Sequence, residues 1–258
     1  MNENIFKRYE LKFMIDKTIF AKMKNEITKY MNLDEYCKKS ESYMIYNIYF
    51  DTENDDIIRK SIEKPYYKEK LRLRCYKIPV TQNDKVFLEL KKKINSIVNK
   101  RRVTMTLQEA ESYLKSSQMP DKMSYMDNQV LNEIPDFLER YQAKQKVFLS
   151  YERVAFYGKD NHDFRITFDR NILTRREKAN FTAGDFGAEL LDDDKYLMEV
   201  KICGAIPLWL AHLMSDIKIY KTSFSKYGEE YKKNARTNKQ NNIQDEKEAF
   251  LRKCFLTA

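Results

Sequence analysis

Charged residues alternate with apolar residues at a period of two in several separate segments of this chain. The pattern occurs in residues 8–13, 68–76, 86–93 and 99–106. Successive side chains of a β-strand point to opposite faces of a sheet, so this spacing places all the charges of a segment on one face. Residues 84–106 also predict a hairpin that turns near Asn95 and Ser96, two residue types that favour turns. The chain is therefore expected to form a sheet with one strongly charged face.

The rest of the chain predicts more strands with helices between them. Further strands are predicted at residues 43–51, 144–157, 164–170 and 195–203, where β-branched and aromatic residues concentrate. Helical spacing occurs in residues 17–31, 54–62, 107–115, 128–140 and 205–217. Thr106, followed three residues later by Glu109, resembles a capping box at a helix start. This order of elements, without a fixed-period repeat, is typical of an α+β fold with antiparallel strands.

The charged face is predicted to line a wet interior. Its pooled basic residues are Lys12, Lys70, Arg72, Arg74, Lys91, Lys100, Arg102 and Lys201. Neighbouring strands lie about 5 Å apart, so these like charges repel, whereas natural surfaces usually mix the two signs. Burying one unpaired charge costs several kcal/mol, against a net stability of about 5–15 kcal/mol for a whole domain. We therefore expect a curled sheet, with helices outside and a channel filled by water, counter-ions or a polyanion.

The overall charge favours a polyanionic partner. The chain has 48 Lys+Arg against 39 Asp+Glu and a formal net charge of +9, which leaves nucleic acid, phospholipid, nucleotide and polyphosphate open. Phosphate chains suit such a channel because Arg binds their oxygens bidentately and Lys acts as a point charge. The sequence has no RRM, KH or helix-turn-helix signature, so we expect no nucleic-acid partner. It also has no P-loop motif, so side chains are expected to bind the phosphates.

Composition along the chain predicts one main domain in the cytoplasm. No stretch approaches the roughly 20 apolar residues of a membrane span, and the start has no signal-peptide pattern, so a cytoplasmic protein without a membrane span is expected. The four cysteines are far apart with no CxxC pair, which favours reduced thiols over a zinc site. We predict a main domain over residues 1–232 and a polar C-terminal helical tail over residues 233–258.

Three predicted strands contain a Glu, an apolar residue and a Lys in succession. They are residues 10–12, 89–91 and 199–201, and the spacing puts both charges of each triplet on one face. For Glu10 and Glu89, cross-strand ion pairing and a catalytic role are both open. Mg²⁺ and Mn²⁺ bind carboxylate oxygens and bridge protein to substrate phosphates, so one or two carboxylates among many bases would suffice for a metal site.

Seven short motifs follow one another along the chain. They are RYELKF at 8–13, KLRLR at 70–74, FLELK at 87–91, YER at 151–153, RITFD at 165–169, LMEVK at 197–201 and FSKY at 224–227. In this order and spacing they resemble the VTC domain, the polyphosphate polymerase domain of the vacuolar transporter chaperone complex and its soluble bacterial relatives. That domain belongs to the triphosphate tunnel metalloenzyme (CYTH-like) superfamily, and the resemblance spans about residues 5–232.

The resemblance implies a fold, an activity and a set of partners. The implied fold is an antiparallel eight-stranded β-barrel tunnel with helices packed outside. The implied reaction is transfer of the γ-phosphoryl group of ATP onto a growing polyphosphate chain, with Mn²⁺ or Mg²⁺ as cofactor. ATP and polyphosphate would then be the partners, and orthophosphate or pyrophosphate would be the candidate primers.

The resemblance also implies roles for individual residues. The predicted catalytic residues are Lys12, Arg72, Arg74, Lys91, Arg153, Arg165 and Lys226. Lys100 would contact phosphates, Ser225 would assist, and Tyr151 would lie beside the nucleotide base. Glu199 would bind the metal. The charge pattern adds further substrate-binding candidates, namely Glu10, Lys70, Glu89, Arg102 and Lys201.

One departure from the superfamily pattern bears on the reaction. The wider superfamily begins with a Glu-x-Glu-x-Lys strand, whereas Arg8 occupies the first Glu position here. That change removes a metal ligand and favours polymerase over hydrolase. Two alternatives stay open: an inorganic triphosphatase or nucleotidase of the same fold, in which water replaces the phosphate acceptor, and a polyphosphate-binding module without turnover.

Overall fold

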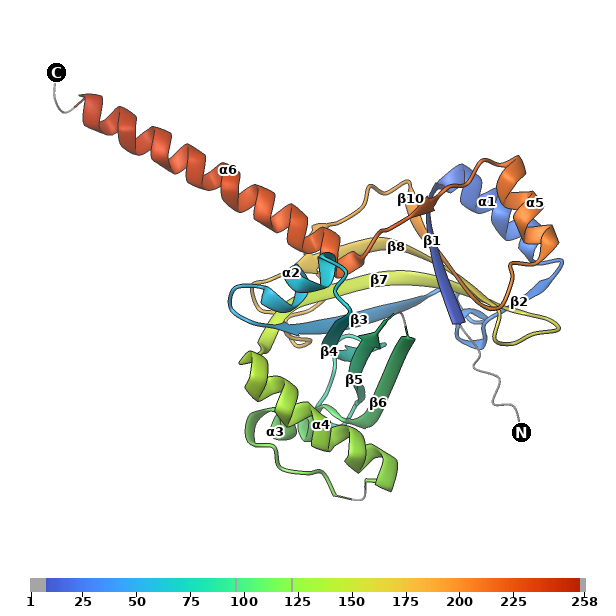
Figure 1. The fold of residues 1–258 in the computed structure, drawn as a ribbon, viewed down its shortest axis with the longest axis horizontal. Coiled ribbons are helices and arrows are strands. Elements are labelled where there is room, and N and C mark those ends of the chain that lie inside the picture. The colour runs from blue at the N-terminus through green and yellow to red at the C-terminus, as the bar shows by residue number, and fades with distance from the viewer. Residues whose placement is uncertain (1–7, 96, 122, 256–258) are drawn as a thin grey trace.

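One large antiparallel sheet dominates the computed structural model, which describes residues 8–255 apart from 96 and 122 (Figure 1). The strands are β1 (Arg8–Asp16), β2 (Met31–Leu33), β3 (Tyr43–Asp51), β4 (Tyr67–Cys75), β5 (Lys85–Ile94), β6 (Ile97–Thr106), β7 (Lys144–Gly158), β8 (Arg165–Arg175), β9 (Ala188–Glu189), β10 (Lys195–Cys203) and β11 (Lys221–Thr222). The helices are α1 (Lys17–Ile27), the 3₁₀ helix η1 (Glu35–Cys37), α2 (Asp56–Ile62), α3 (Leu107–Ser116), α4 (Tyr125–Tyr141), α5 (Leu208–Asp216) and α6 (Lys226–Phe255). The predicted α+β class with antiparallel strands is confirmed.

The sheet does not close into the predicted eight-stranded barrel. Within the described residues it has eleven strands in the order β11-β1-β10-β8-β7-β3-β4-β5-β6, with β2 paired to β7 and β9 paired to β8. Closure would require β6 to pair with the outer edge of β1, but β11 already pairs there with Lys12 and Phe13. It would also bring Lys100 and Arg102 of β6 close to Lys12, and like charges on paired strands repel.

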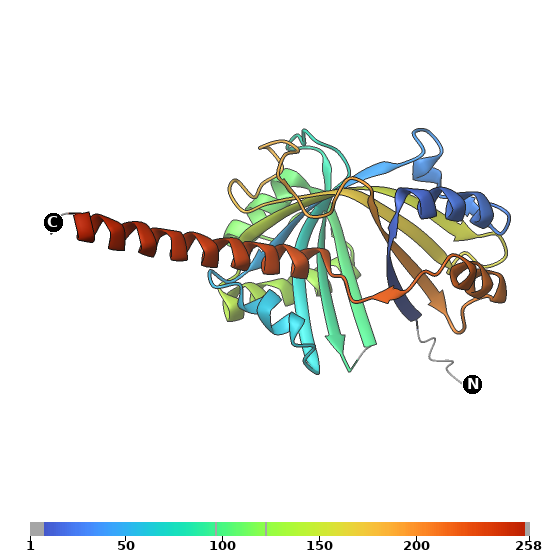
Figure 2. The same cartoon turned by 90° about the horizontal axis from the view of Figure 1, so that it is seen from above.

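The open sheet is nevertheless strongly curled. Figure 2 shows the half built from β4, β5 and β6 turned toward the half built from β1 and β10. Charges from the two halves affect one another: Lys12 of β1 contributes to lowering the pKa of Lys70 in β4, and Lys91 of β5 contributes to lowering that of Glu10 in β1. Four strands separate β1 from β4 in the sheet order. The inner surface of this curl is called the concave face below.

Apolar residues of the strands pack on the outer side of the curl. One core cluster joins Leu71, Leu88 and Val103 of β4–β6 to Leu131 and Phe137 of α4. A second joins Phe13, Phe168 and Val200 to residues of α1 and α5, including Met23 and Leu210. Because strand side chains alternate, burying these residues outside turns the charged residues inward. The helices thus cover the outer face, as predicted.

Local signals account for most element boundaries. The predicted capping box is confirmed: the Thr106 hydroxyl accepts from the Glu109 N–H at 3.2 Å, and the Glu109 carboxylate accepts from the Thr106 N–H at 2.7 Å. Asn95 adopts a left-handed φ of 41° in the predicted hairpin turn, whereas Ser96 lies outside the described residues. The first helix ends at Ile27, earlier than predicted, because Met31 begins β2 and pairs with β7.

Helix α6 begins beside the sheet and continues far beyond it (Figure 1). It runs without a break across residues 232 and 233, so the division into a main domain and a tail stays a prediction. In the part of the chain that the structure describes, none of the helices combines the length and the apolar character that crossing a membrane requires.

Candidate functional site

Strand register brings the predicted basic residues of separate strands together on the concave face. Arg72 lies opposite Glu89, which lies opposite Arg102. On the other side of the curl, Glu199 lies opposite Lys12. Directly opposite residues of antiparallel strands share a face, so the charges that alternate along each strand form one continuous surface. The sequence-predicted charged face is therefore real, and it is the interior of the curl.

Glu89 is the centre of one ion-pair cluster on this face. Its side chain is 1% exposed and accepts from Arg72 Nε at 2.5 Å, Arg102 Nε at 2.6 Å and Lys100 Nζ at 3.0 Å. Burial raises the pKa of Glu89, but the surrounding cations outweigh burial and hold it well below its usual range. For Glu89, the structure shows cross-strand ion pairing.

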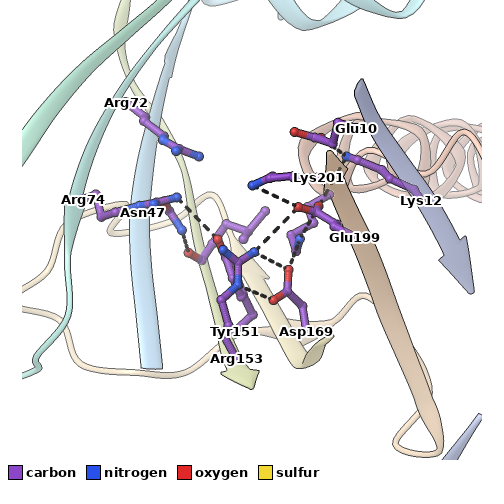
Figure 3. Close-up of polar contacts among 12 residues, drawn as sticks. Glu10, Lys12, Asn47, Arg72, Arg74, Tyr151, Arg153, Asp169, Glu199 and Lys201 are labelled. Atoms are coloured by element: carbon purple, nitrogen blue, oxygen red, sulfur yellow. Dashed lines mark hydrogen bonds and ion pairs between the residues drawn. The ribbon is translucent and has the colours of Figure 1, made fainter. Parts of the chain in front are cut away.

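Asp169 and Glu199 form a second cluster with cations from three other elements (Figure 3). Arg153 donates to both oxygens of Asp169, at 2.6 and 2.7 Å. Lys226, the first residue of α6, lies 2.5 Å from Asp169 and 3.3 Å from Glu199. Burial raises the pKa of Asp169, but the charges of Arg153 and Lys226 outweigh burial and hold it below its usual value. We call this set, completed by Lys12, the carboxylate cluster.

Four cationic side chains surround the single negative charge of Glu199. Besides Lys226, its carboxylate lies 3.5 Å from Lys12 Nζ, 3.8 Å from Arg153 Nη2 and 3.8 Å from Lys201 Nζ. The pKa of Glu199 is held well below its usual range: burial raises it, and Lys226, Lys12 and Arg153 lower it more. This carboxylate is therefore ionised at any physiological pH.

Arg74 joins the two clusters across the floor of the curl. It is buried, its Nε donates to Asn47 Oδ1 at 2.9 Å, and its Nη2 donates to the Tyr151 hydroxyl at 3.4 Å. The Tyr49 hydroxyl in turn accepts from Arg72 at 3.1 Å. Asn47 and Tyr49 were not among the sequence-predicted site residues. Their period-two spacing in β3, among apolar residues, was the signal that could have found them.

The Tyr151 ring is already in contact with cations. Its side chain is buried, with Lys226 Nζ 4.5 Å and Arg153 5.2 Å from the ring centroid. Aromatic faces attract cations in this way, most strongly where water is excluded. The predicted position of Tyr151 next to a nucleotide base stays a prediction, and the ring is shared with the carboxylate cluster.

Four lysines form a patch that makes no ion pair with the carboxylates that the structure describes. This lysine patch consists of Lys68, Lys70, Lys91 and Lys93, which lie opposite one another in β4 and β5. Lys70 makes no ion pair with a described residue; burial, followed by the charges of Lys68, Lys91 and Lys12, lowers its pKa to about 7. Like charges directly opposite each other destabilise a sheet. The patch therefore favours an anion from outside the protein.

Two predicted residues lie away from both ion-pair clusters and from the lysine patch. Arg165 shares the concave face with Lys201, but its guanidinium pairs with Asp34 at 2.5 Å, outside both clusters. Ser225 immediately precedes α6, and its hydroxyl accepts from the Gly228 N–H at 3.3 Å, as a helix-capping residue does. Their predicted roles stay untested. The side chain of Arg8 lies outside the described residues.

The carboxylate donors fit a metal only if it arrives with its own anions. Glu10 and Glu199 both lie 3.5 Å from Lys12 Nζ, so one cation already bridges them. Across residues 8–255, gaps excepted, no group of three or more His, Cys, Asp or Glu side chains could hold a metal ion. The buried Thr167 hydroxyl, in the strand position opposite Glu199, makes no hydrogen bond to any residue in the described part of the chain. Mg²⁺ is commonly bound by one or two carboxylates plus substrate phosphates, which matches this donor set.

A family model described as the VTC domain matches residues 7–234, which include every predicted site residue. This chain belongs to the VTC domain family. The resemblance inferred from the seven motifs is thereby confirmed, and the family is associated with polyphosphate chemistry. Within this VTC domain, both ion-pair clusters and the lysine patch lie inside the matched region.

Other comparisons gave only distant likenesses to this VTC domain. No curated protein is significantly similar to it in sequence. A proposed adenylate cyclase of Bacillus halodurans is 16% identical, with 85% of this chain and 95% of that chain covered and a TM-score of 0.49. A protein of Pyrococcus horikoshii OT3 is 13% identical, covers 88% and 99%, and has a TM-score of 0.42. The Schizosaccharomyces pombe Mediator head module contains a chain 9% identical, covering 82% and 90%, with a TM-score of 0.41.

Proposed function

We propose that this VTC domain is a polyphosphate polymerase that transfers the γ-phosphoryl group of ATP onto a growing polyphosphate chain. The observation that carries the proposal is the lysine patch, where Lys70 is half-buried among like charges with its pKa lowered to about 7. Burying unpaired cations costs several kcal/mol each, so the concave face gains most from a ligand with many negative charges. Polyphosphate is such a ligand.

The transferred phosphoryl group would lie between the two ion-pair clusters. Phosphoryl transfer passes through a loose transition state whose charge spreads over the equatorial oxygens, so positioning and electrostatic stabilisation dominate catalysis. Arg72 and Arg74 approach this space from β4, and Arg153 approaches it from β7 (Figure 3). Each holds a carboxylate, amide or hydroxyl partner at present, and that partner fixes the direction of the guanidinium. The fixed donors would bind the equatorial oxygens with little rearrangement.

The acceptor needs no general base in this proposal. The terminal phosphate of a polyphosphate chain, or an orthophosphate or pyrophosphate primer, is ionised at neutral pH and can attack directly. Lys12, Lys201 and Lys226 would hold it against the donor phosphates and offset their mutual repulsion. A divalent cation, when bound, would add positive charge between the donor phosphates, and Glu199 with Glu10 nearby would hold it.

A product assay tests the proposal. The protein is incubated with ATP and Mn²⁺ or Mg²⁺, and long-chain polyphosphate, ADP and orthophosphate are measured together. We expect polyphosphate and ADP in the wild type, and a loss of at least about 100-fold in Glu199→Gln, as for removal of one electrostatic stabiliser. The exposed Glu177 provides the matched control, Glu177→Gln, which should keep full activity.

Two results would contradict the polymerase assignment, and a third would contradict the metal role of Glu199. Orthophosphate without polymer would make the protein a triphosphatase or nucleotidase. Binding of polyphosphate without ATP consumption under either metal would make it a binding module. Full activity of Glu199→Gln would remove Glu199 from the metal site. Thermal unfolding of each variant shows whether a lost activity reflects a lost fold.

A further inference from the structure

Four aromatic side chains form a connected group at one end of the concave face. Ring centroids lie 5.9 Å apart for Tyr36 and Tyr43, 6.2 Å for Tyr43 and Tyr76, and 5.4 Å for Tyr76 and Phe87. Tyr36 is 79% exposed and Tyr76 is 40% exposed, whereas core aromatics are covered on both faces. We call these four residues the aromatic rim. The exposure of Tyr36 and Tyr76 means that packing alone does not explain these two rings.

The most exposed ring of the rim is held on a well-anchored segment. Tyr36 lies in η1, and its N–H donates to Asp34 Oδ1 at 3.1 Å. Asp34 pairs with Arg165, and its N–H donates to the Ala155 carbonyl at 2.8 Å. The thiol of Cys37 accepts from the Ala155 N–H at 3.4 Å. A ring presented on such a fixed backbone loses little conformational freedom when a ligand packs on it.

The rim is continuous with the arginines of the concave face. Tyr43 lies opposite Arg153 in the β3–β7 register. Tyr76 follows Arg74 by two residues at the end of β4, and the Arg102 guanidinium lies 4.7 Å from the Phe87 ring centroid. The rim therefore lies next to the arginines that the phosphates of a ligand would engage.

The chemistry of the rim suits a flat, polarisable group. Exposed Tyr rings stack on nucleobases, and such stacking is tolerant of base identity because every base has a π face. Tyr151 offers less surface for stacking, because its ring is buried and already contacts Lys226 and Arg153. A protein partner would need a larger exposed apolar surface than one Tyr ring beside the arginines provides.

We propose that the aromatic rim binds the base of the nucleoside triphosphate donor. This assignment rests on the proposed function, because it takes a nucleotide to be the source of the phosphoryl group. Tyr36 and Tyr76 supply the stacking faces, and Tyr43 backs them beside Arg153. The nucleotide then enters base-outward, with its γ-phosphate deepest in the concave face.

Binding measurements with two ligands test the rim separately from catalysis. The affinities of ATP and of inorganic tripolyphosphate are measured by calorimetry for wild type, Tyr36→Ala and Tyr76→Ala, without turnover. Stacking on one aromatic side chain corresponds to roughly a tenfold change in affinity, so each variant should lose about that factor for ATP. Tripolyphosphate, which has no base, should bind all three proteins equally. Tyr36→Phe keeps the ring and should keep the ATP affinity.

The exposed Tyr220, at 76%, provides the control Tyr220→Ala, which should change neither affinity. An unchanged ATP affinity in both rim variants would overturn the assignment, and so would an equal loss for both ligands. Absence of polymer product in the separate assay would contradict the polymerase but not a base-dependent loss of ATP binding. Thermal unfolding confirms that each variant is folded; if Tyr36→Ala is not, Tyr76→Ala still decides.

Discussion

The two halves of the concave face treat their charges in opposite ways. In the carboxylate cluster, Arg153 and Lys226 are almost fully buried, and Asp169 and Glu199 neutralise them within 4 Å. In the lysine patch, Lys70 and Lys91 lie opposite each other with no carboxylate partner among the described residues. The carboxylate cluster pairs its buried cations without a ligand, and the lysine patch does not.

This difference suggests a division of labour. Ion pairs that are satisfied in the empty protein fix side chains in place, which suits a centre that must position reacting groups. Charges that are left unpaired cost stability until an anion arrives, which suits a surface that must hold a long polyanion and let it move. The proposed chemistry therefore belongs to the carboxylate cluster, and the proposed product path to the lysine patch.

Removing Asp169 should have the largest effect on stability. Its carboxylate is 0% exposed and neutralises Arg153 and Lys226, so Asp169→Asn leaves two buried cations with only Glu199 nearby. Breaking a buried pair by deleting one partner costs about 3–5 kcal/mol. We expect the free energy of unfolding, measured with urea, to fall by about 3 kcal/mol, because Glu199 compensates in part.

Asp136, an exposed residue of α4, gives the matched control. Asp136→Asn should stay within about 0.5 kcal/mol of wild type, as surface substitutions usually do. If Asp169→Asn is as stable as this control, the carboxylate cluster is not pre-neutralised and the contrast between the two halves fails.

Removing Lys70 should have a smaller effect of the opposite sign. Lys70→Met keeps most of the length of the side chain and removes a charge that makes no ion pair with a described residue. We expect the empty protein to gain about 1–2 kcal/mol of unfolding free energy, part of the several kcal/mol that fully burying an ion costs, because Lys70 is only half-buried. The same variant should bind polyphosphate more weakly. A destabilised Lys70→Met protein would show that Lys70 has a stabilising partner after all.

Much of the fold and of the charged face was predictable from the sequence, because period-two alternation has one structural meaning. The strand at residues 43–51 and the strand at residues 195–203 were predicted with their observed bounds. The hairpin at 84–106 was also confirmed, since its turn residues and alternation agree. Alternation predicts on which face of the sheet a residue lies. That prediction was enough to assign the basic residues to one surface.

The partners of those residues were not predictable, because they come from strands distant in the sequence. Asp169 lies in the quoted RITFD motif, yet only the β7–β8 register shows that it faces Arg153. Arg165 has the same spacing as its neighbours, but η1 brings Asp34 to it. The open edge of the sheet depends on β11, a strand of two residues with no sequence signal of its own. Tertiary register, rather than local pattern, decided each of these.

The pH dependence of stability should depend most strongly on Lys70, and this is the smallest effect expected. Burial and neighbouring charges lower the pKa of Lys70 from 10.5 to about 7, and burial lowers that of Lys201 to about 8. Between pH 7 and 10.5 the folded protein releases the Lys70 proton while the unfolded chain keeps it, so stability rises with pH across this window. The gain from Lys70→Met should therefore be largest below pH 7 and fade toward pH 10.5.

Polyphosphate binding should show the reverse trend, because it needs the protonated lysine. The inner phosphates of the ligand stay charged across this range, so a decline in affinity between pH 7 and 9 reports the protein. We expect a decline of several-fold in wild type and a shallower one in Lys70→Met, measured by calorimetry at constant ionic strength. Parallel curves for the two proteins would place the titrating group elsewhere. A curve that rises with pH would mean that the unpaired lysines do not bind the chain, and the lysine patch would lose its proposed role.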